Sequence, residues 1–145
     1  MSVTATAHPN IALVKYWGKR DIKMNLPAVS SLSLTLDTFA TTTQVQFAEA
    51  DRVILNGADA PNDFSARVLS FLDRLSDDRA PCLVTTHNNF PTAAGLASSA
   101  SGFAALALAG SRLLHDESLS MDAISKLARL GSGSATRSLF GGFVQ

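Results

Sequence analysis

The sequence predicts an α+β fold in which helices pack on one face of a mainly antiparallel or mixed sheet. Strand-like segments dominate its first part, and helical spacing of apolar residues appears only later. One further strand-like segment separates the first expected helix from the last two. A chain of 145 residues with 46% hydrophobic content is long enough for one domain, residues 1–145, with a buried core.

Five strands are expected before the first helix, because these segments alternate in polarity or are rich in β-branched residues. The S-L-S-L-T-L run places its leucines on one face and Ser31, Ser33 and Thr35 on the other. Asn56-Gly57 marks a turn after the last of the five. The expected strands are Val3–Ala7, Ile11–Tyr16, Ser31–Leu36, Thr41–Phe47 and Arg52–Leu55.

Apolar residues at helical spacing predict the first helix over Phe64–Leu75, capped by Asp63 or Asn62. A strand over Cys82–Thr86 follows, and then a loop over His87–Pro91. The first helix is therefore expected to connect two strands.

Two helices complete the expected pattern. One is expected over Ala97–His115, and the other from a Ser120 cap to Gly131. The chain then enters a turn and a strand over Gly141–Gln145. Because no polar tail follows, we expect the chain to be a fragment of a longer protein.

Composition excludes several classes of function. Twelve Lys plus Arg balance twelve Asp plus Glu, which disfavours a nucleic-acid or anionic-membrane binder. Serines and Arg112 interrupt the apolar stretch Gly95–Leu114, so a transmembrane helix is not expected. His8, His87 and His115 share no metal-ligand spacing. The single cysteine and the absence of a signal-peptide pattern favour the cytoplasm.

The most informative window is P-T-A-A-G-L-A-S-S-A-S-G at residues 91–102. It passes from a loop into a helix whose first turns carry only small and hydroxyl side chains. Unpaired N–H groups at such a helix start suit a phosphate. The window has no Walker A lysine. The alternative is a small-residue helix packed closely against a neighbour.

Two further windows are also suited to anions. K-Y-W-G-K-R at residues 15–20 groups cations and aromatic rings around a glycine, although it could be a solvated strand end. G-S-G-S-A-T-R-S at residues 131–138 combines glycines, hydroxyls and one arginine, although it could be a helix C-cap and a turn. Three such segments in a neutral domain favour a polyphosphate ligand.

Together with N-L-P-A-V-S-S-L-S-L-T-L, these windows resemble the N-terminal part of the diphosphomevalonate decarboxylase family, in the GHMP kinase superfamily. The first window alone indicates only the superfamily, whereas K-Y-W-G-K with G-S-G-S-A-T-R-S indicates the decarboxylase. The resemblance implies a ribosomal protein S5 domain 2-like fold. It also implies ATP- and Mg²⁺-dependent conversion of mevalonate 5-diphosphate to isopentenyl diphosphate, ADP, phosphate and CO₂.

The resemblance assigns residues to both ligands. Arg67 is a weaker diphosphate candidate than the others, and Ser99 is expected near the transferred phosphoryl group. The candidates for the substrate diphosphate are Tyr16, Trp17, Gly18, Lys19, Arg67, Ser132, Gly133, Ser134, Ala135, Thr136 and Arg137. The candidates for the ATP phosphates are Gly95, Leu96, Ala97, Ser98, Ser99, Ala100 and Ser101.

One element of the family pattern is missing. The family's essential aspartate lies toward the C-terminal part of a chain more than twice this length, and no matching segment occurs here. We therefore expect these 145 residues alone to be inactive. The resemblance leaves a homodimer of the full-length enzyme open. The alternatives are a GHMP small-molecule kinase, a decarboxylase of a monophosphorylated mevalonate relative, and a non-catalytic binding module.

Overall fold

The computed structural model describes residues 1–14, 18–91, 98–115 and 119–145. Its main sheet has five strands in the order β1-β6-β9-β7-β8. Neighbours are antiparallel except β7 and β9, which run parallel, so the sheet is mixed as expected. The strands are β1 (Ser2–Ala7), β6 (Thr41–Phe47), β7 (Arg52–Leu55), β8 (Ala58–Asp59) and β9 (Cys82–Asn88).

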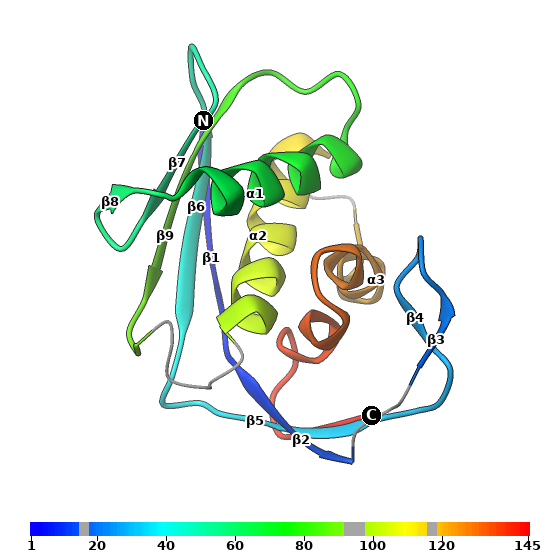
Figure 1. Ribbon diagram of the computed structural model, residues 1–145. Coiled ribbons are helices and arrows are strands. Elements are labelled where there is room, and N and C mark those ends of the chain that lie inside the picture. Colours follow the sequence, from blue (N-terminus) through cyan, green and yellow to red (C-terminus); the bar gives the residue numbers. More distant parts are fainter. Residues whose placement is uncertain (15–17, 92–97, 116–118) are drawn as a thin grey trace.

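Helices cover one face of this sheet, as Figure 1 shows. They are α1 (Asn62–Leu75), α2 (Ser98–Leu114) and α3 (Met121–Gly131), followed by a short 3-10 helix, η1 (Gly133–Arg137). Every residue of α2 from Phe103 to Ser111 is buried. Small side chains along α2 let it lie close to β1 and β6, and this contact forms the centre of the core.

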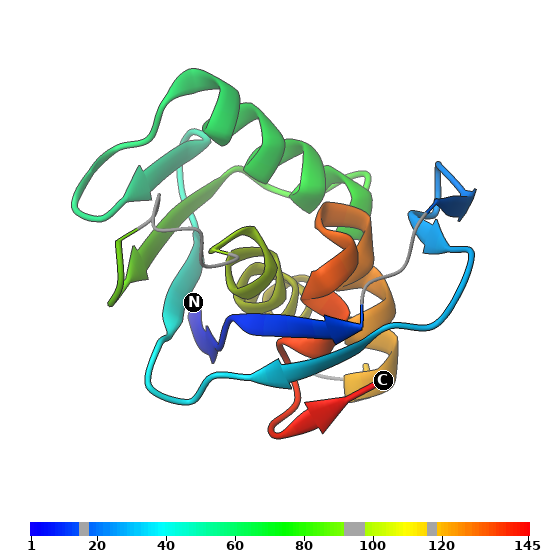
Figure 2. The ribbon, with the colours of Figure 1, turned by 60° about the horizontal axis from the view of Figure 1, so that its bottom comes forward.

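A second sheet lies below α3 and η1. It contains β2 (Asn10–Val14), β5 (Leu32–Thr35) and β10 (Phe143–Val144), in the order β10-β5-β2 (Figure 2). Both outer strands pair antiparallel with β5. Two short strands, β3 (Lys19–Asp21) and β4 (Leu26–Pro27), form a separate hairpin.

The expected alternation of β5 is confirmed, and it is the hydroxyl face that is covered. Ser33 is fully buried and Ser31 is 7% exposed, whereas the leucines of the strand are only half-buried. The apolar face of this second sheet points outward, where Ile11 and Phe143 are exposed. A polar surface buried beneath α3 and η1 requires partners, which the site described below supplies.

Two details of the expected elements were wrong. Asn62 and Asp63 do not cap α1, because the helix already begins at Asn62 and the N-cap position is Pro61, whose carbonyl accepts from the N–H of Ser65. His87 and Asn88 continue β9 instead of forming a loop, because they pair with Thr42 and Thr41 of β6. The Ser120 cap of α3 is confirmed, with its hydroxyl accepting from the N–H of Ala123 at 3.2 Å.

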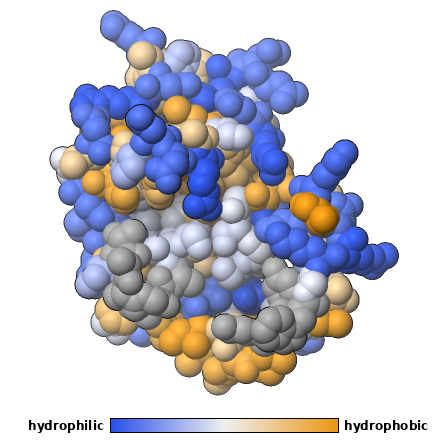
Figure 3. Space-filling view, viewed as in Figure 1, coloured by the Kyte–Doolittle hydropathy of each residue, from blue (hydrophilic) through white to orange (hydrophobic). Residues whose placement is uncertain are grey.

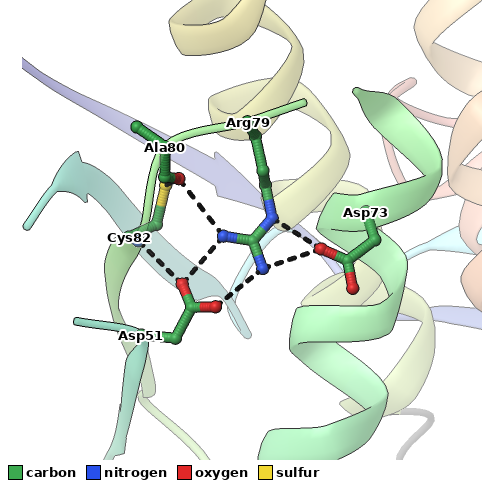
Figure 4. Close-up of polar contacts among 5 residues, drawn as sticks. All are labelled: Asp51, Asp73, Arg79, Ala80 and Cys82. Carbon is green, nitrogen blue, oxygen red and sulfur yellow. Dashed lines mark hydrogen bonds and ion pairs between the residues drawn. The ribbon is translucent and has the colours of Figure 1, made fainter. Parts of the chain in front are cut away.

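A cluster of charged side chains, Asp51, Asp73 and Arg79, connects α1 to the starts of β7 and β9 (Figure 4). The side chain of Arg79 is only 5% exposed and makes a bidentate contact with Asp51, at 2.8 and 3.0 Å. It also donates to Asp73 of α1 at 2.9 Å, and Asp51 accepts the N–H of Cys82. The hydrogen bond from Arg79 lowers the pKa of Asp51, against the opposing effect of burial.

Cys82 itself is fully buried, and desolvation raises the pKa of its thiol. Cys82 is thus a small buried residue of the core. Among the described residues, no helix is long and apolar enough to cross a membrane, and no three metal-ligating side chains come together.

Candidate anion-binding sites

The first candidate site lies at the start of α2. Ser98 is half-buried and Ser99 is exposed, so both side chains can meet a ligand there. Ala100 and Ser101 are fully buried, and their side chains belong to the core. Only their backbone groups could contact a phosphate. Gly95, Leu96 and Ala97, expected at the same turn, lie outside the described residues.

Buried hydroxyl groups hold this end of α2 against the main sheet. The hydroxyls of Thr41 and Ser101 are 2.7 Å apart, and Thr41 donates to Asn88 at 2.5 Å. Ser101 also donates to the carbonyl of Ser98 at 3.3 Å. The start of the helix is therefore fixed by side chains of β6 and β9, which favours a preorganised binding site over a flexible one.

A cavity of about 180 Å³ opens beside Ser98 and Ser99, between α1, α2 and the sheet. Its walls are mostly apolar, with hydroxyl groups at a few points. This combination is typical of sites for small molecules that have an apolar ring and a polar end. The apolar side chains that line it are Leu55, Phe64, Val68, Val84, Phe103 and Leu106.

Arg67 lines this cavity, and it also lines a second cavity together with Leu130 and Gly131, at the start of the G-S-G-S-A-T-R-S window. It lies on the exposed face of α1 and lines the cavity with Ser98 and Ser99. Its guanidinium carbon is 5.4 Å from the centre of the Phe103 ring, a cation–π contact. Arg67 therefore places a positive charge in the cavity that Ser98 and Ser99 also line, at the start of α2.

The second candidate site is η1 and its flanks, where the G-S-G-S-A-T-R-S window forms a turn of 3-10 helix. Arg137 is only 8% exposed, and its guanidinium lies against β5. Its Nε donates to the hydroxyl of Ser33 at 2.8 Å, and its Nη1 donates to the hydroxyl of Ser31. The window follows the end of α3 as expected, and its arginine is buried.

Side chains from two other elements, β2 and α3, hold the η1 backbone. Asn10 of β2 donates to the carbonyl of Ser134 at 3.0 Å and to the hydroxyl of Ser138 at 2.7 Å. Ser125 of α3 donates to the carbonyl of Thr136 at 2.8 Å. Sequence reasoning did not assign a role to Asn10 or Ser125. The available signal for Asn10 was its place directly before an apolar strand-like segment. An amide buried at such a position needs hydrogen-bond partners.

The remaining candidates lie near the β3–β4 hairpin. Lys19 is exposed on β3, and Gly18 has φ of +84°, a conformation that favours glycine. Asn25 in the turn donates to the carbonyl of Arg129 at 2.8 Å, which ties the hairpin to α3. No described contact joins Lys19 to Arg137, and Tyr16 and Trp17 lie outside the described residues.

The chain has the GHMP-kinase fold, like the solved structures that it matches. The features that define this class here are the mixed sheet, the layer of helices on one face and the small residues at the start of α2. Residues 7–145 match the family model for the diphosphomevalonate decarboxylase-like N-terminal domain. The chain belongs to this family.

Named relatives agree with the family match. The diphosphomevalonate decarboxylase of Saccharomyces cerevisiae is 46% identical over 162 residues, which cover 99% of this chain and 41% of the relative. The crystal structure of mevalonate diphosphate decarboxylase from Staphylococcus aureus superposes with a TM-score of 0.90 at 42% identity, over 98% of this chain and 44% of the other. A structure of MDDEF in complex with MVAPP, AMPPCP and magnesium has a TM-score of 0.88 at 48% identity, over 99% of this chain and 45% of the other. The chain thus spans less than half the length of these relatives.

Proposed function

We propose that the chain is the N-terminal part of an ATP-dependent decarboxylase in the mevalonate pathway, which converts (R)-5-diphosphomevalonate to isopentenyl diphosphate, ADP, phosphate and CO₂. The observation that carries this proposal is the family match over residues 7–145. The two candidate anion sites support it, because the reaction needs one place for the substrate diphosphate and another for the nucleotide phosphates.

In this proposal the η1 turn and the β3–β4 hairpin bind the substrate diphosphate. Arg137 supplies a planar guanidinium suited to phosphate oxygens, and Ser134 adds a hydroxyl and a backbone N–H. Lys19, with Tyr16, Trp17 and Gly18, contacts the diphosphate from the other side. A remote diphosphate held at both sides orients the carbon chain, so that binding energy contributes to catalysis.

The start of α2 holds the ATP phosphates. In this proposal the backbone of the first turn and the hydroxyls of Ser98 and Ser99 face these phosphates, and the adjoining apolar cavity suits the nucleoside. Because Arg67 lines the same cavity as Ser98 and Ser99, we assign it to the nucleotide phosphates as well as to the expected role at the substrate diphosphate. With Mg²⁺, ATP supplies the phosphoryl group that turns the 3-hydroxyl into a good leaving group.

The remaining parts of the proposal concern the whole protein. The relatives are more than twice as long as the part matched here, and we place the essential aspartate in the region that this chain does not contain. We also place the enzyme in the cytoplasm, where Cys82, the one cysteine of these 145 residues, stays reduced. A homodimer of the full-length enzyme fits this assignment.

The substrate class is tested in a chimera in which residues 1–145 replace the matching part of the Saccharomyces cerevisiae relative. We expect ADP formation with mevalonate 5-diphosphate and little with mevalonate 5-phosphate. Arg137→Ala should raise KM for the diphosphate at least about tenfold, because a charged hydrogen bond is lost. Equal use of both substrates, or an Arg137→Ala variant with unchanged kinetics, would contradict the assignment. Circular dichroism and thermal unfolding show whether each chimera is folded.

A further inference from the structure

The buried face of β5 carries hydroxyl groups where a small domain usually buries apolar side chains. Ser33 is 0% exposed and Ser31 is 7% exposed, and both face Arg137. Residues two apart on a strand point to the same side, so the two hydroxyls form a row along the strand. We call Ser31 and Ser33 the serine pair.

The serine pair contacts the guanidinium at two different nitrogens. Nε of Arg137 donates to Ser33 at 2.8 Å, and Nη1 donates to Ser31. One hydrogen bond would leave the guanidinium free to rotate about that contact. Two contacts, one from Ser33 of β5 and one from Ser31 directly before the strand, fix both the position and the plane of the group.

The main chain of the same arginine is also fixed. Asn10 and Ser125 hold the carbonyls of Ser134 and Thr136, and Thr35 lies 3.5 Å from the carbonyl of Arg137. An arginine on the surface loses side-chain conformational freedom when it binds a ligand, and this loss weakens binding. At Arg137 most of that loss has occurred on folding.

We propose that Ser31 and Ser33 are positioning residues, which orient the guanidinium of Arg137 for a phosphate-bearing ligand. The role of the ligand rests on the proposed function, whereas the orientation of the guanidinium does not. In the competing explanation, the serine pair only satisfies a buried cation and contributes to stability. The two explanations differ in what removal of one hydroxyl does to ligand binding in a chain that remains folded.

The first measurement is nuclear magnetic resonance of the arginine Nε–Hε groups in the 145-residue chain. The Arg137 signal is assigned by its loss in Arg137→Lys. We expect slow hydrogen exchange at this group, because Nε–H is buried and bonded to Ser33. Ser33→Ala should abolish the protection and Ser33→Thr should retain it. Protection that is unchanged in Ser33→Ala would overturn the inference.

The second measurement is titration of the same variants with inorganic diphosphate. Ser31→Ala and Ser33→Ala should each weaken binding about tenfold, the effect of one lost hydrogen bond to a charged group. Adding either change to Arg137→Lys should cause little further loss, because the serines act through the arginine. Ser111→Ala is the matched control. It removes another buried serine hydroxyl, one with no hydrogen-bond partner in the described part of the chain and no place in either site, and it should leave affinity unchanged.

The outcomes separate the inference from the function on which it rests. Serine-pair variants that bind as tightly as the unmodified chain, while Arg137→Lys does not, would overturn the positioning role. If the Nε–Hε protection behaves as expected but the unmodified chain does not bind diphosphate, the serine contact is supported and the proposed diphosphate site fails. Unfolding temperatures of all variants distinguish lost orientation from a lost fold.

Discussion

Gly131 occupies the last position of α3, where the ring of Phe103 leaves no space for a side chain. An ideal Cβ at this position would lie 2.1 Å from Cδ1 of Phe103. The glycine was expected to end the helix through its conformational freedom. Its backbone is not in the left-handed region, so the reason for glycine is the close approach of α2.

Gly131→Ala should therefore destabilise the chain. Moving the Phe103 ring in a packed core costs about 1–3 kcal/mol. Gly102→Ala is the control, because a Cβ placed there meets no described atom within 4 Å beyond its chain neighbours and the backbone of its own helix. Alanine also favours a helix by about 0.5–1 kcal/mol. Urea unfolding measures both. A Gly131→Ala chain as stable as the unmodified one would show that the ring moves without cost.

The serine pair shows how far sequence reasoning reached at single residues. Alternation along S-L-S-L-T-L correctly separated Ser31 and Ser33 from the leucines. It could not determine which face is covered, because that depends on Arg137, which is more than a hundred residues away in sequence. Long-range polar contacts of this kind leave no local pattern.

At the level of elements, the Arg79 cluster joins α1 to the starts of β7 and β9 in the main sheet. Its pH dependence follows from Asp51, whose pKa lies below that of a free aspartate because Arg79 donates to it. Because the pKa of Asp51 is lower in the folded state than in the unfolded chain, its ionised carboxylate stabilises the folded state at pH values above about 4, the pKa of an aspartate in the unfolded chain. This stabilisation is lost as the pH falls through the lower, folded value.

Asp51→Asn should accordingly lower the free energy of unfolding at about pH 7, and the difference from the unmodified chain should shrink toward about pH 3. Urea unfolding over this range measures it. Asp59→Asn is the control, because Asp59 also pairs with an arginine, Arg52, but both side chains are exposed. Its effect should be small and weaken further in about 1 M salt. A pH-independent effect of Asp51→Asn would contradict this account.

The long elements were predictable from sequence and the short ones were not. Strands β1, β6 and β7 and the three helices carry clear alternation or helical spacing, and their ends were mostly within two residues of those observed. Strands β3, β4 and β8 have two or three residues each, and only pairing with a neighbour makes them strands. The extension of β9 through Asn88 has the same cause.

Of the candidate sites, the sequence indicated the segments but not their surroundings. The small-residue start of α2 and the turn after α3 were found from local composition. The cavity beside Ser98 is formed by side chains from several separate elements, and the support of η1 by Asn10 depends on a contact across 124 positions. Neither leaves a signal within a single window.

At the scale of the whole molecule, the second sheet has an unusual surface. Its outward face carries Ile11 and Phe143, both paired with Leu34 of β5, and these two side chains are 47% and 70% exposed. Apolar colour gathers along the same lower edge of the molecule in Figure 3. Contiguous apolar surface of this kind binds hydrophobic dyes.

The double variant Ile11→Thr and Phe143→Ser should therefore reduce the fluorescence of bound anilinonaphthalene sulfonate by at least about half, with little change in unfolding temperature. Thr42→Ser, on the polar outer face of the main sheet, is the control and should change neither quantity. Undiminished dye binding by the double variant would show that the apolar surface lies elsewhere.

We propose that these 145 residues form the substrate- and nucleotide-binding part of a decarboxylase whose catalytic aspartate lies in a region that this chain lacks. Release of CO₂ from mevalonate 5-diphosphate labelled at the carboxylate tests it most directly. We expect ATP-dependent release by the folded chimera with the Saccharomyces cerevisiae relative, and none above background by the 145-residue chain alone. Release by the chain alone, or none by the folded chimera, would contradict the claim.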